Sequence, residues 1–158
     1  SYLDPGVIAS EAANLKRVCA EEGVFQNTWG GRMHFLRWRH PETMRALDNA
    51  GMDYDSTLGY PERPGFRCGT CIEYQGFDPV AQEALSLRIR PLIAMDVSVA
   101  AKEYLGLGLS DDARAELLRQ KEACKRVRGS FSLLWHNNEL ESSVAKDFYV
   151  SILDSCFV

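Results

Sequence analysis

The segment FSLLWHNN, residues 131–138, is a short apolar run that ends in a histidine. A run of this length and composition is typical of a buried strand. His136 stands near its carboxyl end, which is where α/β barrels place catalytic groups. Because an imidazole has a pKa of about 6.5, it can give or take a proton near neutrality. His136 is therefore the leading candidate for a catalytic residue, beside the simpler interpretation that it caps the strand or bonds a backbone carbonyl.

A second candidate for chemistry is the CGTC motif formed by Cys68 and Cys71. In thioredoxin-like proteins the first thiolate of such a motif is stabilised at the start of a helix. Here the motif follows a loop rich in proline and glycine and leads into residues that do not predict a helix. A structural zinc site needs four ligands, and no second cysteine pair or paired-histidine motif occurs elsewhere. This context weakens both interpretations, and five cysteines without a disulfide pattern predict a reducing compartment, the cytoplasm.

Length and composition predict one soluble domain over residues 1–158 with a substantial core. The chain is 46% hydrophobic and 25% charged, which excludes disordered and fibrous classes. No apolar segment approaches the roughly 20 residues that span a bilayer, so we expect no membrane partner. The formal net charge of -4 argues against nucleic acid as the main partner, since phosphate binding depends on clustered Lys and Arg. Arg32, Arg37, Arg39 and His40 do gather locally, a group typical of a solvated face.

Predicted helices and short strands alternate along the chain. Asp4 can cap the first helix and Gly23 can end it, while Ser110 and Gly129 bound a longer one. The segment 59–79 has no periodicity and is expected to be a functional loop. The alternation predicts an α/β fold with a largely parallel sheet and functional groups at the carboxyl ends of its strands. Further helices are predicted to begin at Pro41 and near Val99, and a last helix contains Val144. The predicted extended segments are 29–38, 52–58, 85–90, 92–95 and 131–138.

Polar residues also stand at two other predicted strand ends. The apolar run LIAM, residues 92–95, is followed directly by Asp96. The strand 52–58 contains Asp55-Ser56-Thr57, whose side chains can form a plain turn by bonding the backbone. Asp96 is therefore a second carboxylate candidate, and for Asp55 a plain turn is the simpler interpretation.

Residues 34–71, HFLRWRHPETMRALDNAGMDYDSTLGYPERPGFRCGTC, resemble the central part of the NodB-homology polysaccharide deacetylases, a carbohydrate esterase family 4-like group. The likeness is closest to a branch found in bacterial surface-polysaccharide gene clusters. RPLIAMDVSV and SFSLLWHNNEL continue it in the same order, so it covers most of the chain. The resemblance implies a distorted, incomplete (β/α) barrel. It also implies a hydrolase that removes N-acetyl or O-acetyl groups from a sugar, acting on carbon–nitrogen bonds other than peptide bonds in the N-acetyl case.

In this family a divalent metal, zinc or cobalt, is held by an aspartate and two histidines and activates water, a second aspartate is the base, and a late histidine is the acid. The late leucine-x-histidine motif matches Leu134 to His136, which implies a general-acid role for His136. Arg67 in GFRCGT matches the arginine that holds the base aspartate by charge-assisted hydrogen bonds. Asp96 matches, more loosely, the aspartate that orients the acid histidine. The expected contacts to an acetylated carbohydrate are His34, Arg37, Tyr60 and Trp135.

Two motifs of the family have no counterpart in the sequence. The threonine-phenylalanine-aspartate run with the base and one metal ligand is missing, and the motif with the metal-ligand histidines is expected just before Ser1. The chain also starts without methionine, so we expect the carboxyl-terminal portion of a longer protein, without the first strands of its barrel and inactive alone. His34 and His40 lie in an expected loop and offer no ligand geometry, so we expect no metal site within these residues.

Three functions follow from the sequence. The first is a metal-dependent carbohydrate deacetylase. The second is a non-catalytic relative that binds a glycan in the same cleft. The third, from another class, is a thiol-redox or thiol-metal protein that uses Cys68 and Cys71.

Overall fold

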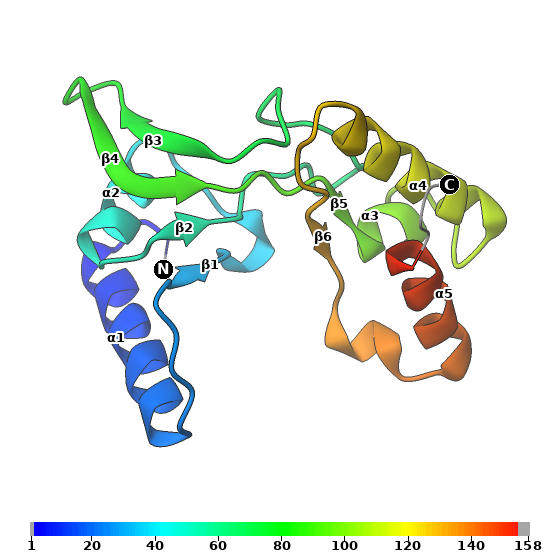
Figure 1. Cartoon of the computed structure of the whole chain (residues 1–158), viewed down its shortest axis with the longest axis horizontal. Helices are drawn as coiled ribbons and strands as arrows, with labels where there is room; N and C mark the ends of the chain where they lie inside the picture. The colour runs from blue at the N-terminus through cyan, green and yellow to red at the C-terminus, as the bar shows by residue number, and fades with distance from the viewer. Residues whose placement is uncertain (1, 155–158) are drawn as a thin grey trace. The chain divides into compact units, whose positions relative to one another are not determined.

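The computed structural model describes residues 2–154, in which helices mix with short strands (Figure 1). The chain forms two compact units. The first takes in the chain up to Leu58 and Glu73–Arg90, and the second takes in Gly59–Ile72 and the chain from Pro91 onward. The predicted α/β class is confirmed, and the single domain over residues 1–158 stays a prediction. Between residues 2 and 154 no helix is both long enough and apolar enough to cross a bilayer.

The two helices of the first unit form where local signals predict them. Helix α1 spans Pro5–Glu21, and the Asp4 side chain accepts two backbone N–H groups of its first turn, as expected for an N-cap. Gly23 follows with a φ of +69°, the left-handed conformation that glycine adopts at a helix end. Helix α2 spans Glu42–Asn49, and Gly51 ends it in the same way with a φ of +66°. Both helices contact each other in the first unit.

The sheet of the first unit is mixed. Strands β1 and β2 pair in parallel, as do β2 and β4, whereas β3 and β4 form an antiparallel hairpin. Helix α2 packs against the hairpin. The parallel part fits the predicted alternation of strands and helices, but the hairpin does not. In spatial order the strands are β1 Gly30–Gly31, β2 Tyr54–Asp55, β4 Glu83–Ile89 and β3 Tyr74–Asp78.

Strand β3 corrects the predicted loop, because its residues were expected to be irregular. Its backbone is ordered by pairing with β4, a contact that no local pattern announces. Gly76 in β3 is required by packing, since a Cβ there would lie 2.7 Å from the sulfur of Met44. The predicted extended segment 29–38 is also wrong in its second half, because His34–Leu36 form the 3-10 turn η1. Of the predicted strand 52–58 only Tyr54–Asp55 pair as β2.

An ion pair between Arg45 and the buried Asp78 joins α2 to the end of β3. Asp78 is fully buried and accepts a hydrogen bond from Arg45 Nη2 at 2.9 Å and another from Arg45 Nε. Two backbone N–H groups of the following turn also donate to Asp78. The Arg45 guanidinium holds the pKa of Asp78 well below its usual range. The pair therefore joins a helix to a hairpin through a buried carboxylate and an arginine that is 39% exposed.

Replacing Arg45 with methionine is expected to lower the melting temperature by several degrees, because Asp78 then stays buried without its cation. Thermal unfolding followed by circular dichroism measures this. Arg39→Met is the matched control, since Arg39 lies 3.7 Å from Glu42 in an exposed pair of the kind that contributes little. The double variant Arg45→Met with Asp78→Asn should regain part of the loss. Equal melting temperatures for Arg45→Met and the control would contradict the assignment.

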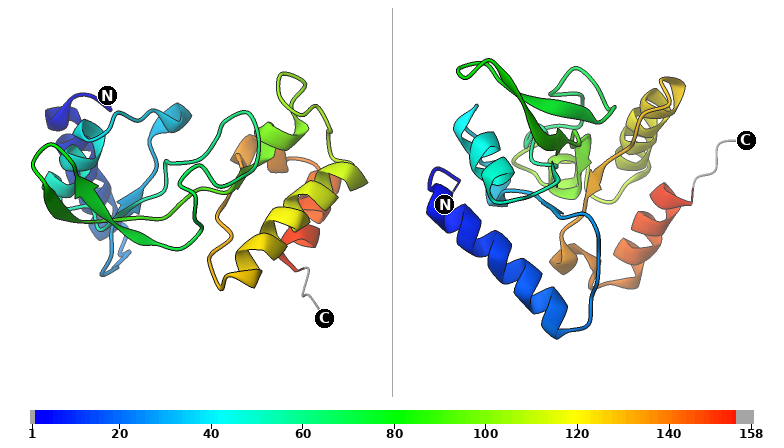
Figure 2. Two further views of the ribbon diagram at one scale, coloured as in Figure 1. Left: turned by 90° about the horizontal axis from the view of Figure 1, so that it is seen from above. Right: turned by 60° about the vertical axis from the view of Figure 1, so that its left-hand side comes forward.

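The second unit is built on two short parallel strands, β5 Ala94–Met95 and β6 Leu133–Leu134. Helices α4 and α5 pack against one another (Figure 2). Lys121 Nζ on α4 donates to the carbonyl oxygen of Ile152 on α5 at 2.7 Å. The helical elements are α3 Asp96–Ala100, α4 Asp111–Arg126, η2 Asn137–Leu140 and α5 Ser143–Leu153. The core of this unit consists of Ala94, Val99, Ala113, Leu117 and Ile152.

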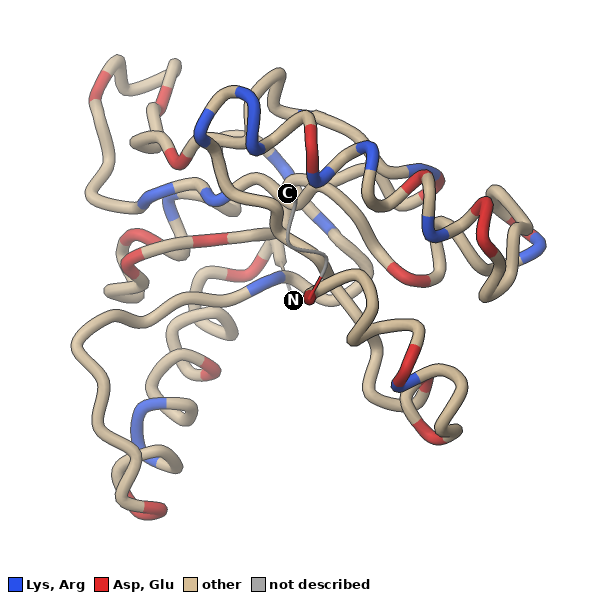
Figure 3. The backbone as a smooth tube through the Cα atoms, turned by 45° about the vertical axis from the view of Figure 1, so that its right-hand side comes forward, with Lys and Arg blue, Asp and Glu red and all other residues tan. Residues whose placement is uncertain are grey.

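Helix α4 matches its predicted start but not its predicted end. Ser110 caps it by accepting the N–H of Ala113 at 3.2 Å. Lys and Arg interleave with Asp and Glu along the helix (Figure 3). Gly129 was expected to end the helix by a left-handed turn, but Arg128 takes that conformation with a φ of +54°. Gly129 is required for space, because a Cβ there would lie 2.2 Å from the sulfur of Cys71.

Candidate functional site

The parallel pairing of β5 and β6 brings Asp96 and His136 together. Ala94 lies opposite Leu133 and Met95 opposite Leu134, so both strands end at the same edge. Asp96 follows β5 directly and begins α3, and His136 stands two residues after β6, just before η2. Residues that follow the carboxyl ends of neighbouring parallel strands meet in this way. His136 was expected at the end of a longer strand, but the backbone leaves the strand at Leu134.

Asp96 binds both the ring and the backbone of His136. Its Oδ1 lies 2.7 Å from His136 Nδ1, and its Oδ2 accepts the backbone N–H of His136 at 2.7 Å. The N–H of Val97 also donates to Oδ1, at 2.7 Å. Asp96 is only 3% exposed, whereas the side chain of His136 is 41% exposed. A buried carboxylate therefore orients a histidine that a bound molecule can reach.

This arrangement defines the chemistry that the His136 ring can perform. Because Asp96 accepts from Nδ1, the proton of the neutral ring is held on that nitrogen. The second nitrogen, Nε2, is then the atom that can exchange a proton with a bound molecule. When the ring is protonated, the carboxylate of Asp96 stabilises the positive charge, as the aspartate of a catalytic triad does. The dyad is therefore suited to general acid–base catalysis.

A cavity of about 190 Å³ adjoins Asp96 within the second unit, and His136 is not among the residues that line it. Trp135 lines it and also packs against the core of the unit, and its contact with a sugar stays a prediction. The Nε1 of Trp135 is buried and finds no hydrogen-bond partner among the residues that the structure describes. Buried donors without a partner are uncommon in folded proteins. The cavity is lined by Asp96, Val97, Ala100, Ala101, Leu109, Trp135 and Glu139.

Arg67, predicted to hold a base aspartate, instead donates from Nη1 to the carbonyl oxygen of Gly59 at 3.0 Å. The residue is exposed and takes part in no ion pair within the described part of the chain. The simpler alternative from the sequence, an ion pair with an acidic residue of the loop 59–79, is therefore not formed in the structure. Its role toward a base aspartate stays a prediction.

The expected substrate contacts lie in both units. His34 and Arg37 line a cavity of the first unit, and Trp135 lines the cavity of the second. Tyr60 is half-buried in the second unit, with the Arg63 guanidinium 5.0 Å from the centre of its ring. Their contact with a carbohydrate stays a prediction.

The two thiols of CGTC differ in their surroundings. Cys71 is buried in a small core with Ile93 and Cys124, whereas Cys68 is half-buried. Burial raises the pKa of the Cys124 thiol to about 12, and a hydrogen bond with Cys71 adds to the effect. A reactive thiol needs access and a lowered pKa. Cys71 is buried beside Cys124 in this core. These surroundings argue against a reactive thiol at Cys71.

The described residues do not fit the metal that the family resemblance implies. Within residues 2–154 no group of three or more His, Cys, Asp or Glu side chains is arranged to hold a metal ion. The Asp96 carboxylate already accepts three hydrogen bonds, two from His136 and one from the N–H of Val97. We therefore assign no step of a reaction to a metal held by these residues. The expected tail of the metal-binding motif at Ser1 lies outside the described residues.

Asp55 is a buried carboxylate whose setting the sequence did not reveal. The predicted turn is confirmed, because the N–H of Thr57 donates to Asp55 Oδ1 at 2.8 Å and the Thr57 hydroxyl donates to Oδ2 at 2.7 Å. The residue is fully buried, and burial raises the pKa of Asp55 to about 6. Perturbed carboxylates gather at functional sites as well as in structural networks. Its place within the predicted strand 52–58 was the only sequence signal for its burial.

Known proteins provide no independent assignment for this site. No protein-family model, no curated protein and no solved structure matches the chain. The geometry of the described residues is therefore what supports a function.

Proposed function

We propose that the chain belongs to a carbohydrate deacetylase and contributes its general acid, His136. The observation behind this proposal is the Asp96–His136 dyad at the carboxyl edge of two parallel strands. The motif resemblance agrees with that role for His136. The acid would protonate the sugar nitrogen or oxygen as its bond to the acetyl carbon breaks.

Asp96 acts through His136 in this proposal. It keeps one ring nitrogen protonated and stabilises the imidazolium until the proton leaves from Nε2. The bond to the backbone N–H of His136 fixes the ring's position as well as its tautomer, because ring and backbone are then held by one carboxylate. Asp96 is therefore a positioning residue.

The finer fold that goes with this function is part of a distorted (β/α) barrel. The parallel pairs β1–β2, β2–β4 and β5–β6 are compatible with it. The water that attacks the acetyl group must be activated by a base and a metal, which in the family come from motifs that have no counterpart in this sequence.

Acetate release by the natural full-length protein tests the proposal. Oligomers of N-acetylglucosamine and an O-acetylated polysaccharide are incubated with the protein, with and without added zinc or cobalt, and acetate is measured by an enzyme-coupled assay. Release from either substrate at a rate above that of a heat-denatured control is the expected result. Binding of these saccharides without any release would favour the non-catalytic glycan-binding alternative and contradict the enzyme.

A further inference from the structure

The first unit has a cavity of its own, with a volume of about 320 Å³. This volume falls within the range of small-ligand sites. Two guanidinium groups and an imidazole face one carboxylate there, so the local charge favours an anion although the chain as a whole is acidic. The lining residues are Tyr2, Glu11, Arg32, Met33, His34 and Arg37.

Arg32 is held rigidly beside this cavity. Its Nε donates to the carbonyl oxygen of Ser56 at 2.7 Å, and its Nη2 donates to the Ser56 hydroxyl at 3.0 Å. A guanidinium has five N–H donors, so these two bonds leave donors for a ligand. Burial lowers the pKa of Arg32, while the nearby Asp55 carboxylate opposes that effect. An anion gains more from a partly desolvated cation than from one in open water.

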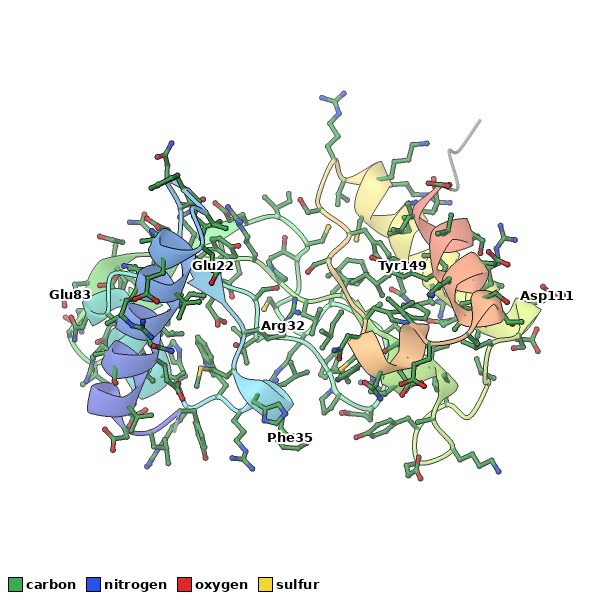
Figure 4. The ribbon with its side chains drawn as sticks, turned by 90° about the horizontal axis from the view of Figure 1, so that it is seen from below. Glu22, Arg32, Phe35, Glu83, Asp111 and Tyr149 are labelled. Atoms are coloured by element: carbon green, nitrogen blue, oxygen red, sulfur yellow. The ribbon has the colours of Figure 1, made fainter. Side chains whose placement is uncertain are left out.

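The turn after β1 displays an aromatic ring in a strained backbone conformation. Phe35 has a φ of +59° and Leu36 a φ of +51°, the left-handed region that such side chains rarely adopt. Leu36 is buried, whereas Phe35 is 73% exposed. Phe35 and Arg32 come from the same segment of the chain (Figure 4). Strain of this kind persists where the surroundings enforce it, and it gathers at ligand sites.

The Phe35 ring lies beside the cavity and not in its lining, but it contacts two residues that do line it, His34 and Arg37. The centroid of the Phe35 ring lies 4.1 Å from that of His34, and the Arg37 guanidinium lies 5.3 Å from the ring centre. An open aromatic face beside cations suits the apolar face of a sugar ring that has a charged substituent. Arginine matches the geometry of both carboxylate and phosphate. The Glu11 carboxylate can accept a hydrogen bond from a sugar hydroxyl, and the Tyr2 hydroxyl can donate or accept one.

We propose that this cavity binds an anionic sugar, a pyranose with a carboxylate or phosphate group, with the ring against Phe35 and the anion on Arg32 and Arg37. This inference extends the expectation that His34 and Arg37 contact a carbohydrate, and it does not depend on the deacetylase function, because no step of hydrolysis enters it. The bound residue can be a unit of an acidic glycan or a free sugar phosphate, and the two differ in the anion that Arg32 and Arg37 prefer.

Isothermal titration calorimetry on the chain tests the proposal with four probes: methyl glucuronide, glucose 1-phosphate, neutral methyl glucoside and inorganic phosphate. We expect the preferred anionic sugar to bind at least about tenfold more tightly than the neutral sugar, because a charge-assisted bidentate bond is lost with the anion. Tighter binding of the glucuronide indicates an acidic glycan, and tighter binding of glucose 1-phosphate indicates a sugar phosphate. Equal affinity for the neutral sugar and the preferred anionic sugar would overturn the proposal, and so would a preference for glucose 1-phosphate that inorganic phosphate matches.

Matched variants separate the ring from the fold. Phe35→Asn removes the ring but keeps a residue that tolerates the left-handed conformation, so the turn is preserved. We expect it and Arg37→Gln each to weaken binding by about tenfold. Phe35→Trp should restore the affinity. The controls are Phe25→Asn, at a phenylalanine that is 87% exposed and does not line the cavity, and Arg39→Gln on the same surface segment. Loss of affinity in the controls as large as in the variants would refute the site, whatever the result of the acetate assay.

Discussion

The variant His136→Ala is expected to release acetate about 10²–10⁴ times more slowly than the wild-type protein, which is the usual contribution of a positioned general acid. The loss should fall on kcat more than on KM, because the proton is transferred only as the bond to the leaving group breaks. A leaving amine is a poor leaving group without a proton, so N-acetyl substrates should suffer more than O-acetyl substrates. Unchanged release would remove the general-acid assignment of His136.

Asp96→Asn separates positioning from proton transfer. The Asp96 carboxylate accepts from His136 Nδ1 and from the His136 backbone N–H at once, but an amide offers only one accepting oxygen. Either the ring turns to the other tautomer or the backbone bond is lost. We expect acetate release to fall by at least about 10²-fold, with a change in the ¹⁵N shifts of the His136 ring that reports its tautomer. Asp147→Asn, at an exposed position of α5, is the control and should change neither.

The dyad shows how far the sequence alone could predict the site. His136 and Asp96 were each placed near the end of an apolar run by local pattern, and both predictions hold in outline. The register that joins them, Met95 opposite Leu134, depends on the pairing of segments about 40 residues apart. Only the family resemblance connected the two residues before the structure did.

Helix boundaries were predictable because their signals are local. The caps at Asp4 and Ser110 act within three residues of the side chain that makes them. The same reasoning failed at Gly129, where glycine is needed for the approach of Cys71 and not for a turn. A glycine has two physical uses, and a sequence does not show which one applies.

Neither strand β3 nor the burial of Asp55 could be predicted from the sequence, and the reason is the same for both. Both depend on packing against other elements and not on the local pattern: β4, the next strand along the chain, orders β3, and the first unit removes Asp55 from water. The turn around Asp55 was predictable because its hydrogen bonds are local. The free energy of the buried carboxylate was not, because it depends on how much water the surrounding elements exclude.

Asp55 should contribute to the stability of the chain in a way that falls as the pH rises, the opposite direction from an ion-paired carboxylate. Burial raises the pKa of Asp55 to about 6, above the value of about 3.9 for an unfolded chain, so the folded state keeps its proton longer. Between these two pKa values the folded state binds more protons, and its stability therefore falls as the pH rises. Above pH 6 both states have lost the proton and this contribution stays constant. The Thr57 bonds and the charge of Arg32 limit the rise in the pKa but do not abolish it.

Asp55→Asn removes this titration while keeping an oxygen that can accept the N–H of Thr57. The free energy of unfolding of the variant, relative to wild type, should rise by about 3 kcal/mol between pH 4 and pH 7, the equivalent of a pKa shift of about two units. Urea unfolding at a series of pH values measures it, and subtracting the two curves cancels the other carboxylates. Asp111→Asn, at the exposed start of α4, should give a flat difference. A flat difference for Asp55→Asn as well would mean that water reaches this carboxylate and that its burial does not hold in solution.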